Sequence, residues 1–485
     1  MDRQLPGSDL ALPTAAQESE GRANTPPLPP GLLRRSLITI VVGSFLLRGA
    51  SGAMGENIQF YLNAIHAAAQ SPSHPLRYLF GAAHVYPISY TLGGVIIGSF
   101  FAAELLGALW LGAWSDRYGR KLFILLGPLL GALAVQITAF TTVVWLLILT
   151  RLLEGLSTAS NAPATLGYLA EASAHSPKLR ARLAGFFEVA TVGGMALGFS
   201  LGGWLWRHFG MPAIIARLRL TSPAFALNAV IYLASFLVLA WGITEIRRPR
   251  AAAQPGHTLG ETVRHYWRIV SAPRVAGFVP AWIAINAVLG VWINLTARIL
   301  TDKTGFPGQL LAGRFDSFQA GNILTAYAIF FVFGILMWSM FFGQVKKVTA
   351  MLIGTAGLFL SCLAIFALNH QSALNAPLVR PLALLLVASI MVQSGFTPAA
   401  LAHLADITET HTADRGAIMG LYSVFLGLGQ FLGASLGGPF VDWRGADGLV
   451  IATTLLGVFA AVVLVRLYAS ENRPGALAPS SPPAG

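Results

Sequence analysis

Long apolar segments recur along the whole chain and constrain its fold more than any other feature of the sequence. Each is near twenty residues long and does not alternate, and a helix of that length crosses the hydrocarbon core of a bilayer. Because backbone groups cannot stay unpaired in lipid, such segments must be helices. Only 11% of the 485 residues are charged, against roughly 25% in soluble domains. The sequence therefore predicts an all-α integral membrane protein.

We predict twelve spans along the chain. In order they cover residues 36–62, 86–113, 121–141, 143–169, 183–204, 223–243, 275–299, 320–342, 348–368, 379–405, 416–439 and 446–467. The predicted domains are a disordered tail at 1–32, a six-helix bundle at 33–245, a linker with an amphipathic helix at 246–273, a second six-helix bundle at 274–468 and a tail at 469–485. Both tails are polar and rich in proline, which is typical of segments that bury no core.

Positive charge is concentrated in short loops on one side of the predicted spans. The net charge is +12, but basic residues in such loops set the orientation of a membrane protein, and no nucleic-acid partner is predicted. The pattern predicts a multi-pass protein of the plasma (inner) membrane with both termini in the cytoplasm. The N-terminal charges have no apolar stretch close behind them, so no cleavable signal peptide is expected. The single cysteine, Cys362, excludes a disulfide within the chain.

The stretch GALWLGAWSDRYGRK joins the second and third spans. Its apolar run ends at Asp116, turns at Gly119 and resumes after Arg120, which predicts a tight cytoplasmic hairpin between two helices. Gly107 and Gly112 would let the first of these helices approach the backbone of a neighbour.

This hairpin, glycine spacing included, resembles the signature loop between helices 2 and 3 of the major facilitator superfamily. The resemblance covers about residues 36–468 and implies twelve helices in two pseudo-symmetric six-helix bundles around a central substrate site. It implies that Arg117 pairs with Glu171 at the foot of the fourth span, while Asp116 faces the start of the eleventh. Such contacts would hold the two halves together on the cytoplasmic side. Gly343 stands at the equivalent point of the second half, so this charge latch is expected only once.

An internal repeat indicates that the two halves share one design. After a shift of 235 residues, a proline, an acid, an arginine and a series of glycines coincide without a gap across two spans and their loop. Glu171 falls on Asp406, and Arg180 falls on Arg415. We interpret six residues as a conformational gate. They are Asp116, Arg117, Gly119, Arg120, Glu171 and Arg180.

The fourth span carries two opposite charges inside the membrane. Arg151 lies about 12 Å from the outer end of the span, where a charge must face a cavity or a partner. Glu154 is three residues further along and shares the same helix face. The run resembles a helix-4 motif of the family that is implicated in proton coupling and has Gln in place of Glu154. Two interpretations stay open: Glu154 carries a proton, or it neutralises Arg151.

Four further charged residues lie within spans: Arg48 and Glu56 in the first, Glu104 in the second and Glu188 in the fifth. Each acid either takes up and releases a proton, because burial favours its neutral form, or pairs with a cation such as Arg48. Polar and aromatic side chains complete the predicted lining of a cavity. These are Asn286, Trp292, Asn294, Arg298, Asn322, Tyr327 and Gln393.

The fifth span has regularly spaced glycines, which include Gly194, Gly198 and Gly202. Their pattern resembles the helix-5 motif of antiporters in the family, although Phe199 stands where that motif has Pro. The eleventh span repeats the pattern, which favours a role in helix packing. The motif therefore favours export only slightly.

These observations predict a secondary active transporter that works by alternating access. We expect proton-coupled efflux of a lipophilic or drug-like small molecule. One alternative is uptake of a small polar solute, such as a sugar or an organic ion. A second alternative is a membrane scaffold or sensor that transports nothing, although a scaffold has no need to bury charges such as Arg151.

The sequence contains neither a phosphate-binding Gly-Lys-Ser/Thr loop nor a Ser/His/Asp arrangement within the spans, so we expect no ATP hydrolysis or other enzyme activity. No cofactor or metal is predicted, because His403 and Asp406 are placed together at the inner end of a span. The expected partners are the small-molecule substrate, protons or another coupling ion, and membrane lipids. The protein is expected to be a monomer.

Overall fold

The fold is given by a computed structural model of the chain. It describes residues 29–173, 176–215, 217–245, 264, 268, 271, 273–303, 306–341, 344–410 and 415–472. Nearly all of the predicted N-terminal tail, most of the predicted linker and the end of the predicted C-terminal tail lie outside these residues, and so does Gly343.

Six long helices form the first bundle. They are α2 (Pro30–Gln70), α4 (Tyr90–Tyr118), α5 (Arg120–Thr138), α6 (Val144–Ala172), α7 (Pro177–Phe209) and α8 (Pro223–Gly242). The short elements α3 (Pro75–Phe80) and η1 (Ala82–His84) follow α2, and the antiparallel strands β1 (Ala213–Ile215) and β2 (Leu218–Leu220) precede α8. This β-hairpin is a departure from the all-α prediction, and it lies in a loop.

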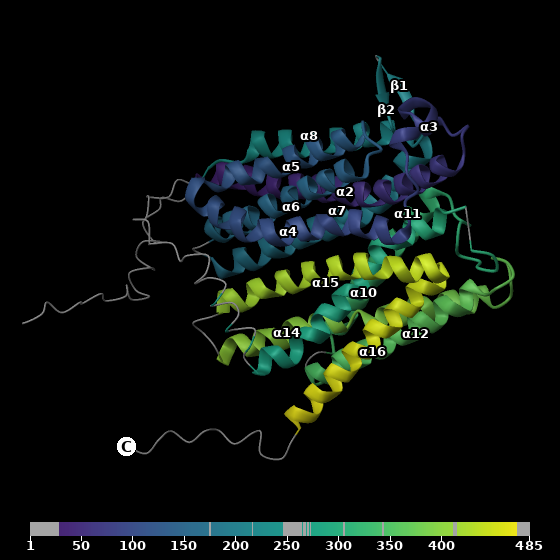
Figure 1. The fold of residues 1–485 in the computed structure, drawn as a ribbon. Helices are drawn as coiled ribbons and strands as arrows, with labels where there is room; N and C mark the ends of the chain where they lie inside the picture. The colour runs from purple at the N-terminus through teal and green to yellow at the C-terminus, as the bar shows by residue number, and fades with distance from the viewer. Residues whose placement is uncertain are drawn as a thin grey trace, which may run out of the picture.

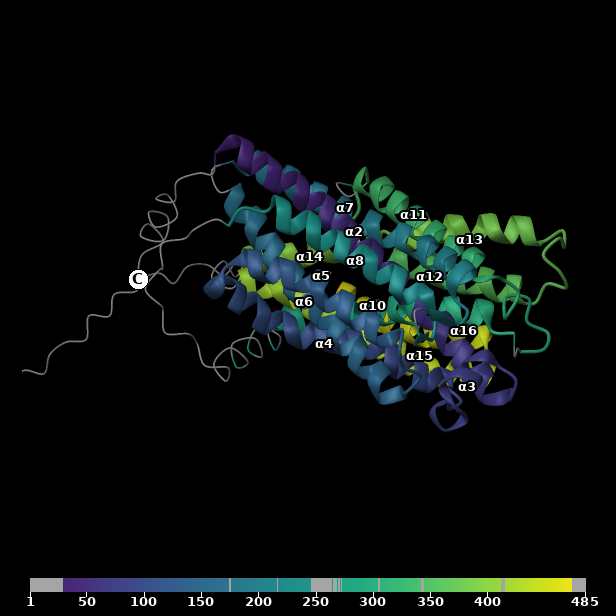
Figure 2. The same ribbon diagram turned by 90° about the horizontal axis from the view of Figure 1, so that it is seen from above.

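The second bundle repeats the arrangement. It contains α10 (Pro273–Thr301), α11 (Ser317–Ser339), α12 (Lys347–Asn369), α13 (Val379–Gln393), α14 (Phe396–Thr410), α15 (Arg415–Arg444) and α16 (Ala446–Glu471). Figure 2 shows α11 between α7 and α13, where the two bundles meet. The predicted tenth span is divided into α13 and α14, because Pro398 has no N–H group to donate to the carbonyl oxygen of Ser394. Helices α2 and α16 each extend slightly into a predicted tail.

Eleven helical segments in the described residues are long and apolar enough to cross a membrane. Helix α6 has 29 residues, as many as α4, but its polar side chains make it less apolar. It packs against both α4 and α5 inside the first bundle, so we count it as the twelfth span.

Glycines form an equivalent seam in each bundle. Gly194, Gly198 and Gly202 of α7 face α2 so closely that an added Cβ atom would lie 2.4, 2.5 and 2.6 Å from a backbone oxygen. Gly429 and Gly433 of α15 face α10 in the same way, at 2.5 and 2.0 Å from the nearest atom. The paired seams follow the internal repeat and indicate that these glycines allow close helix packing.

The two glycines of the α4 hairpin differ from each other. A Cβ atom at Gly107 would lie 2.7 Å from Leu156 and 3.0 Å from Ala159 of α6, so this position has no room for a side chain. At Gly112 the nearest atom would be 3.6 Å away on Pro163, which is an ordinary contact. The predicted close approach therefore holds at Gly107 and is not required at Gly112.

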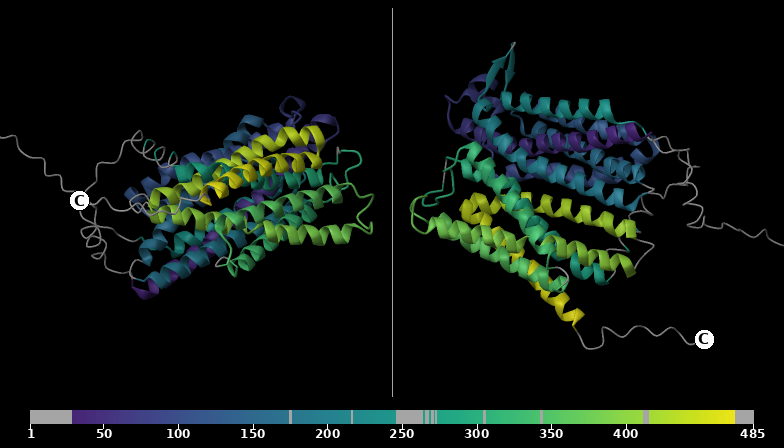
Figure 3. Two further views of the ribbon diagram at one scale, coloured as in Figure 1. Left: turned by 90° about the horizontal axis from the view of Figure 1, so that it is seen from below. Right: turned by 180° about the vertical axis from the view of Figure 1, so that it is seen from behind.

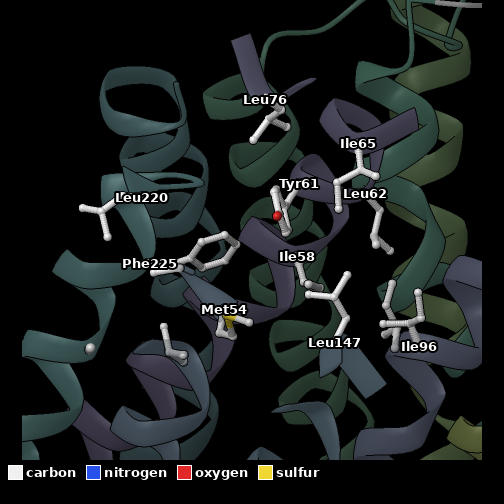
Figure 4. Packing of buried hydrophobic residues seen from close by; sticks show 14 of the residues in the cluster. Met54, Ile58, Tyr61, Leu62, Ile65, Leu76, Ile96, Leu147, Leu220 and Phe225 are labelled. Carbon is white, nitrogen blue, oxygen red and sulfur yellow. The ribbon is translucent and has the colours of Figure 1, made fainter. Parts of the chain in front are cut away.

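A core of apolar side chains joins the helices of the first bundle. Figure 4 shows Met54, Ile58 and Tyr61 of α2 together with Leu147 of α6 and Phe225 of α8. The rings of Tyr61 and Phe225 meet edge to face with centroids 5.2 Å apart. Because lipid is as apolar as these side chains, the core is stabilised mainly by its packing contacts.

The two ends of the molecule differ. We call the end with the α4–α5 turn the hairpin end, and the end with α3 and the β-strands the opposite end; they lie at the left and the right of Figure 1. Helix α2 begins and α16 ends at the hairpin end (Figures 1 and 3). Within the described residues, all hydrogen bonds between the two bundles lie in the half nearer the opposite end. The bundles are therefore fastened together at the opposite end.

Candidate functional site

The α4–α5 turn forms as predicted and is capped by an acid that sequence reasoning missed. Gly119 has a φ of +102°, a conformation that side chains disfavour. Glu245, which follows α8, accepts hydrogen bonds from the backbone N–H groups of Arg120 and Lys121 at 3.1 and 3.0 Å. A carboxylate at this position satisfies two of the free N–H groups at the start of α5 and faces its positive dipole end.

Arg120, and not Arg117, makes the ion pair that the resemblance implied at the foot of α6. Its guanidinium group lies 2.8 Å from Asp116 and 3.1 Å from Glu171. Gly167 of α6 makes room for it, because an added Cβ atom there would lie 1.4 Å from the Arg120 Nη1 atom. Arg117 is exposed and forms no ion pair with a described residue. The prediction chose the wrong arginine because the turn at Gly119 directs the later one toward α6.

The remaining gate predictions have different outcomes. The side chains at the start of α15 lie outside the described ones, so contact of Asp116 with that helix stays a prediction. Arg180 is exposed, and no ion pair joins it to a described side chain. In the second bundle Lys347 pairs with Asp406, which repeats the contact of Arg120 with Glu171. An ion pair between a basic residue at the start of one helix and an acid near the inner end of the following span is therefore present in both bundles.

The two charges inside α6 neutralise each other. Arg151 and Glu154 form an ion pair whose side chains are only 4% and 2% exposed. The hydroxyl group of Tyr232 on α8 donates to Glu154 at 3.1 Å, and the Arg151 guanidinium lies 5.0 Å from the centre of the Phe100 ring. This geometry favours the neutralising interpretation, because Arg151 and the Tyr232 hydroxyl group engage the two carboxyl oxygens of Glu154. Transfer of a proton through Glu154 stays a prediction.

Three more predicted charges occupy different environments. Arg48 of α2 and Glu104 of α4 are both half-buried, and the charge of Arg48 acts on the Glu104 carboxyl group. Glu188 is exposed on α7. It lies three helical turns before Phe199, whose carbonyl oxygen lies against Gly321 of α11, so Glu188 shares the face of α7 that points toward the second bundle.

Glu56 is the acid with the least compensated environment. It is 0% exposed on α2, and neither carboxyl oxygen has a hydrogen-bond partner in the part of the chain that the structure describes. An added Cβ atom on Gly202 of α7 would lie 2.9 Å from the Cβ atom of Glu56. The glycine seam thus encloses Glu56 at the contact between α2 and α7.

A pocket lies within the second bundle and holds three of the predicted lining residues. These are Asn286, Tyr327 and Gln393, with the Gln393 amide donating to the Tyr327 hydroxyl at 3.3 Å. The cavity volume of the pocket is about 50 Å³ in this conformation. Its other lining residues are apolar or small, and they are Trp282, Ile285, Val288, Leu289, Phe331, Gly354, Leu358, Phe396 and Thr397. No charged side chain is among them. Such a pocket suits an aromatic molecule with a few hydrogen-bonding groups.

The other predicted lining residues do not line this pocket. Asn294 is buried and bonds the Gly290 carbonyl oxygen of its own helix at 2.8 Å. Asn322 accepts a hydrogen bond from Ser200 of α7 at 2.7 Å, so it joins the bundles. Trp292 packs in an apolar cluster of the second bundle. Arg298 belongs to a separate group of residues at the opposite end.

Arg298 of α10 reaches across to the first bundle. Its side chain is among the most buried in the protein, at 1% exposure. It donates to the Asn63 amide oxygen at 3.0 Å, to the Ser89 carbonyl oxygen at 2.9 Å and to the Ile88 carbonyl oxygen at 2.5 Å. The guanidinium group also lies 4.2 Å from the centre of the Tyr90 ring.

Two acids of the second bundle complete this group. The Tyr90 hydroxyl donates to Asp302 at 2.7 Å. Asp442 of α15 accepts the backbone N–H groups of Tyr90 and Thr91 at 2.7 and 2.8 Å. We call the opposite-end cluster the set Asn63, Ile88, Ser89, Tyr90, Thr91, Arg298, Asp302 and Asp442. The sequence offered only Arg298 as a signal, because the partners lie hundreds of residues away along the chain.

The described residues contain no group of three or more His, Cys, Asp or Glu residues that could hold a metal ion. His403 is mostly buried against the ring of Phe278, with centroids 5.2 Å apart, and Asp406 is engaged by Lys347. Their environments match the predicted structural role at the end of a span.

A membrane fold of two helical bundles with buried charges and an internal pocket is typical of transporters. The sequence model of the Major Facilitator Superfamily matches residues 37–313 and 306–484. The chain belongs to this superfamily and is a multi-pass membrane transporter rather than an enzyme.

Two curated relatives and two solved structures illustrate the likeness. Multidrug resistance protein 1 of Bacillus subtilis (strain 168) is 24% identical over 383 residues, which cover 78% of this chain and 87% of that protein. The class B tetracycline resistance protein of Escherichia coli is 25% identical over 249 residues, or 48% and 57% of the two chains. A variant of the nucleoside transporter NupG has a TM-score of 0.67 at 15% identity, covering 90% of this chain and 99% of that one.

A bacterial homologue of the human lysosomal transporter Spinster, in an inward-facing and unoccupied conformation, has a TM-score of 0.64 at 15% identity and covers 92% of this chain and 100% of that one. At these identities the solved structures show the fold alone.

Proposed function

We propose that this transporter exports lipophilic small molecules in exchange for protons, by alternating access. Glu56 carries the proposal. An ionised carboxylate that is fully buried without a partner is strongly unfavourable, so Glu56 is stable in this conformation only with a proton bound. A helix movement that exposes the group to water would let the proton leave. The acid can therefore couple proton release to the rearrangement of α2 against α7.

The pocket in the second bundle supports a lipophilic substrate. Rings of Trp282, Tyr327, Phe331 and Phe396 line it together with two amide side chains. Aromatic faces bind flat apolar molecules and cations, while the amides fix orientation without demanding a charge. Arg48, Glu104 and Glu188 belong to the first bundle, and their charges would select among substrates at its wall.

The two ends and the named relatives together support the proposed direction of transport. Basic residues predict that the hairpin end lies in the cytoplasm, and the hydrogen bonds that join the bundles in the described part of the chain lie toward the opposite end. This conformation would then accept its substrate from the cytoplasm. Relatives named as multidrug and tetracycline resistance proteins favour export of such a substrate.

Uptake of a small polar solute is the second candidate. The amides and hydroxyl of Asn286, Gln393 and Tyr327 in the pocket offer hydrogen bonds to such a molecule, and structures named for nucleoside and D-xylose–proton transport share the fold. The apolar remainder of the pocket ranks this candidate second.

Purified protein in liposomes with an imposed pH gradient tests the proposal. The panel contains fluorescent aromatic cations, neutral aromatic compounds, nucleosides and sugars. Accumulation of an aromatic compound against its gradient, in exchange for protons, is expected. Glu56→Gln should lose the dependence on the pH gradient but keep exchange of labelled for unlabelled substrate.

The matched control is Glu471→Gln, which removes an exposed acid at the end of α16 and should retain both activities. Transport of sugars or nucleosides alone would replace export by the second candidate. Full gradient-driven transport by Glu56→Gln would overturn the role of Glu56. Movement of no solute by well-folded protein would favour the scaffold alternative.

A further inference from the structure

We propose that Arg298 is a positioning residue that works as an exchange latch. It binds the first bundle while the opposite end is closed, and it binds Asp302, which directly follows its own helix, when that end opens. The inference rests on the alternating access proposed above. It concerns how the closed end is held and released, and it adds residues that the predicted gate at the hairpin end does not contain.

All three nitrogen atoms of the Arg298 guanidinium group bond to the first bundle. The acceptors are Asn63 and the carbonyl oxygens of Ile88 and Ser89, just before α4 begins. A buried guanidinium group is stable only when its donors are satisfied. If the bundles separate here, Arg298 loses these acceptors at once and needs another partner.

The fit at this contact is specific to the closed state. An added Cβ atom on Gly93, in the first turn of α4, would lie 2.2 Å from Nη1 of Arg298. Gly94 is equally close to the second bundle, with an added Cβ 2.1 Å from the carbonyl oxygen of Ala434. The start of α4 therefore has no room for side chains at two positions while the ends are together.

Asp302 is placed to become the new partner. It follows Arg298 by four residues, directly after α10 ends at Thr301, and its charge acts on the Arg298 guanidinium group. In the closed state it accepts the hydroxyl proton of Tyr90 at 2.7 Å. Tyr90 belongs to α4, so it leaves together with the carbonyl acceptors of Arg298. The same movement thus removes the acceptors of Arg298 and the Tyr90 hydroxyl group that donates to Asp302, while the two residues stay four positions apart in the chain.

Asp442 stabilises the closed state but adds little to the free-energy cost of opening it. Its carboxylate caps the first two N–H groups of α4 across the bundles, but the residue itself is exposed. When the bundles separate, water can solvate Asp442 with little penalty. The closed end therefore combines a buried arginine that must exchange partners with an exposed acid that can simply be released.

Distances between spin labels across the opposite end test the latch. Replacement of the single cysteine, Cys362→Ser, allows labels at Gln70→Cys on α2 and Lys303→Cys after α10, both exposed. Full-length protein in lipid nanodiscs should show a short and a long distance. Arg298→Gln should raise the ratio of long to short by about tenfold or more, because the closed state loses charge-assisted hydrogen bonds.

Asp302→Asn should shift the ratio in the other direction. Asparagine can still accept the Tyr90 hydroxyl in the closed state, but it offers Arg298 no ion pair in the open state. Arg207→Gln is the matched control, because its ion pair with Asp316 also joins the bundles at this end but is 52% and 41% exposed. It should leave the ratio within about twofold of wild type.

The measured distances distinguish failure of the latch from failure of alternating access. Two distances whose ratio ignores Arg298→Gln, or an Asp302→Asn shift in the same direction as Arg298→Gln, would overturn the latch and leave alternating access standing. One unchanged distance in every variant would overturn alternating access itself. If Arg298→Gln fails to fold, Gly93→Ala displaces the guanidinium group without removing its charge, and it should also favour the long distance.

Discussion

Helices α4 and α5 both begin beneath a carboxylate group, but the two acids come from different parts of the molecule. Glu245 binds the first two N–H groups of α5 from within the same bundle. Asp442 binds the first two N–H groups of α4 from the other bundle. The same chemistry therefore fixes a turn within one bundle at the hairpin end and fastens the two bundles together at the opposite end.

The arginines beside these caps differ in the same way. Arg120 is held by Asp116 and Glu171, both in the first bundle. Arg298 of the second bundle donates only to the first. The comparison teaches that the location of the acceptors, and not the strength of the bonds, decides the role of a buried cation. Loss of Arg120 should lower stability, whereas loss of Arg298 should change the balance between conformations.

The largest expected effect is that of Gly167→Ala at the hairpin end. The new methyl group would occupy the place of the Arg120 guanidinium group and break the ion pair of Arg120 with Glu171. We expect a fall of about 3 kcal/mol in the free energy of unfolding, measured as a lower Tm in detergent. The matched control is Gly185→Ala, since nothing lies within 4 Å of the added atom there. A Tm for Gly167→Ala equal to that of the control would contradict the packing of Arg120 on α6.

Arg120→Gln tests the comparison itself. It should lower the free energy of unfolding by about 2 kcal/mol, because charged groups lose part-buried hydrogen bonds. The distance ratio between labels at Gln70→Cys and Lys303→Cys should stay that of wild type, unlike that of Arg298→Gln. In combination with Gly167→Ala the two losses should not add, since both changes remove the same contacts. A shift of the distance ratio by Arg120→Gln would break the distinction between the two ends.

Glu245→Gln sharpens the role of the cap. The amide keeps one acceptor oxygen but loses the negative charge at the start of α5, so we expect a loss of about 1 kcal/mol in unfolding free energy. Asp442→Asn makes the equivalent change at α4 and should act on the distance ratio instead. Equal effects of the two variants on the free energy of unfolding and on the distance ratio would contradict the proposed difference between the two caps.

Arg117→Gln should have the smallest effect. Arg117 is exposed and forms no ion pair with a described residue, so its free energy of unfolding should stay within about 0.5 kcal/mol of wild type, and its transport rate should be unchanged. Thermal unfolding and the liposome assay check both. A severe loss of transport with unchanged stability would restore Arg117 to the gate, in a conformation other than this one.

Local sequence patterns were sufficient to predict the helices. They were insufficient to predict which side chains from distant parts of the chain contact each helix. The turn at Gly119 and the pair of Arg151 with Glu154 follow from neighbours in the chain, and both were predicted. Glu245 was missed because its partners lie more than a hundred residues earlier. Choosing Arg120 over Arg117 required the direction in which the second helix leaves the turn, which depends on packing against Gly167.

The same limit applies to the opposite end. Arg298 was predicted to line a cavity, but a lone arginine in a span does not tell which bundle holds its acceptors. Pro398 is visible in the sequence, but it does not by itself predict that the tenth span is divided there. Proline is also tolerated inside membrane helices. Pro128, Pro163 and Pro280 lie within unbroken helices of this chain, so only the structure could tell where a helix ends.

Hydrogen–deuterium exchange at the two capped helix starts tests the central claim most directly. Peptides that contain the first N–H groups of α4 and of α5 would be compared in wild type and Arg298→Gln, in lipid nanodiscs. The account predicts that exchange at Tyr90 and Thr91 rises at least tenfold in the variant while exchange at Arg120 and Lys121 is unchanged, since only the former are capped across the bundles. Unchanged exchange at both starts, or an equal rise at both, would contradict it.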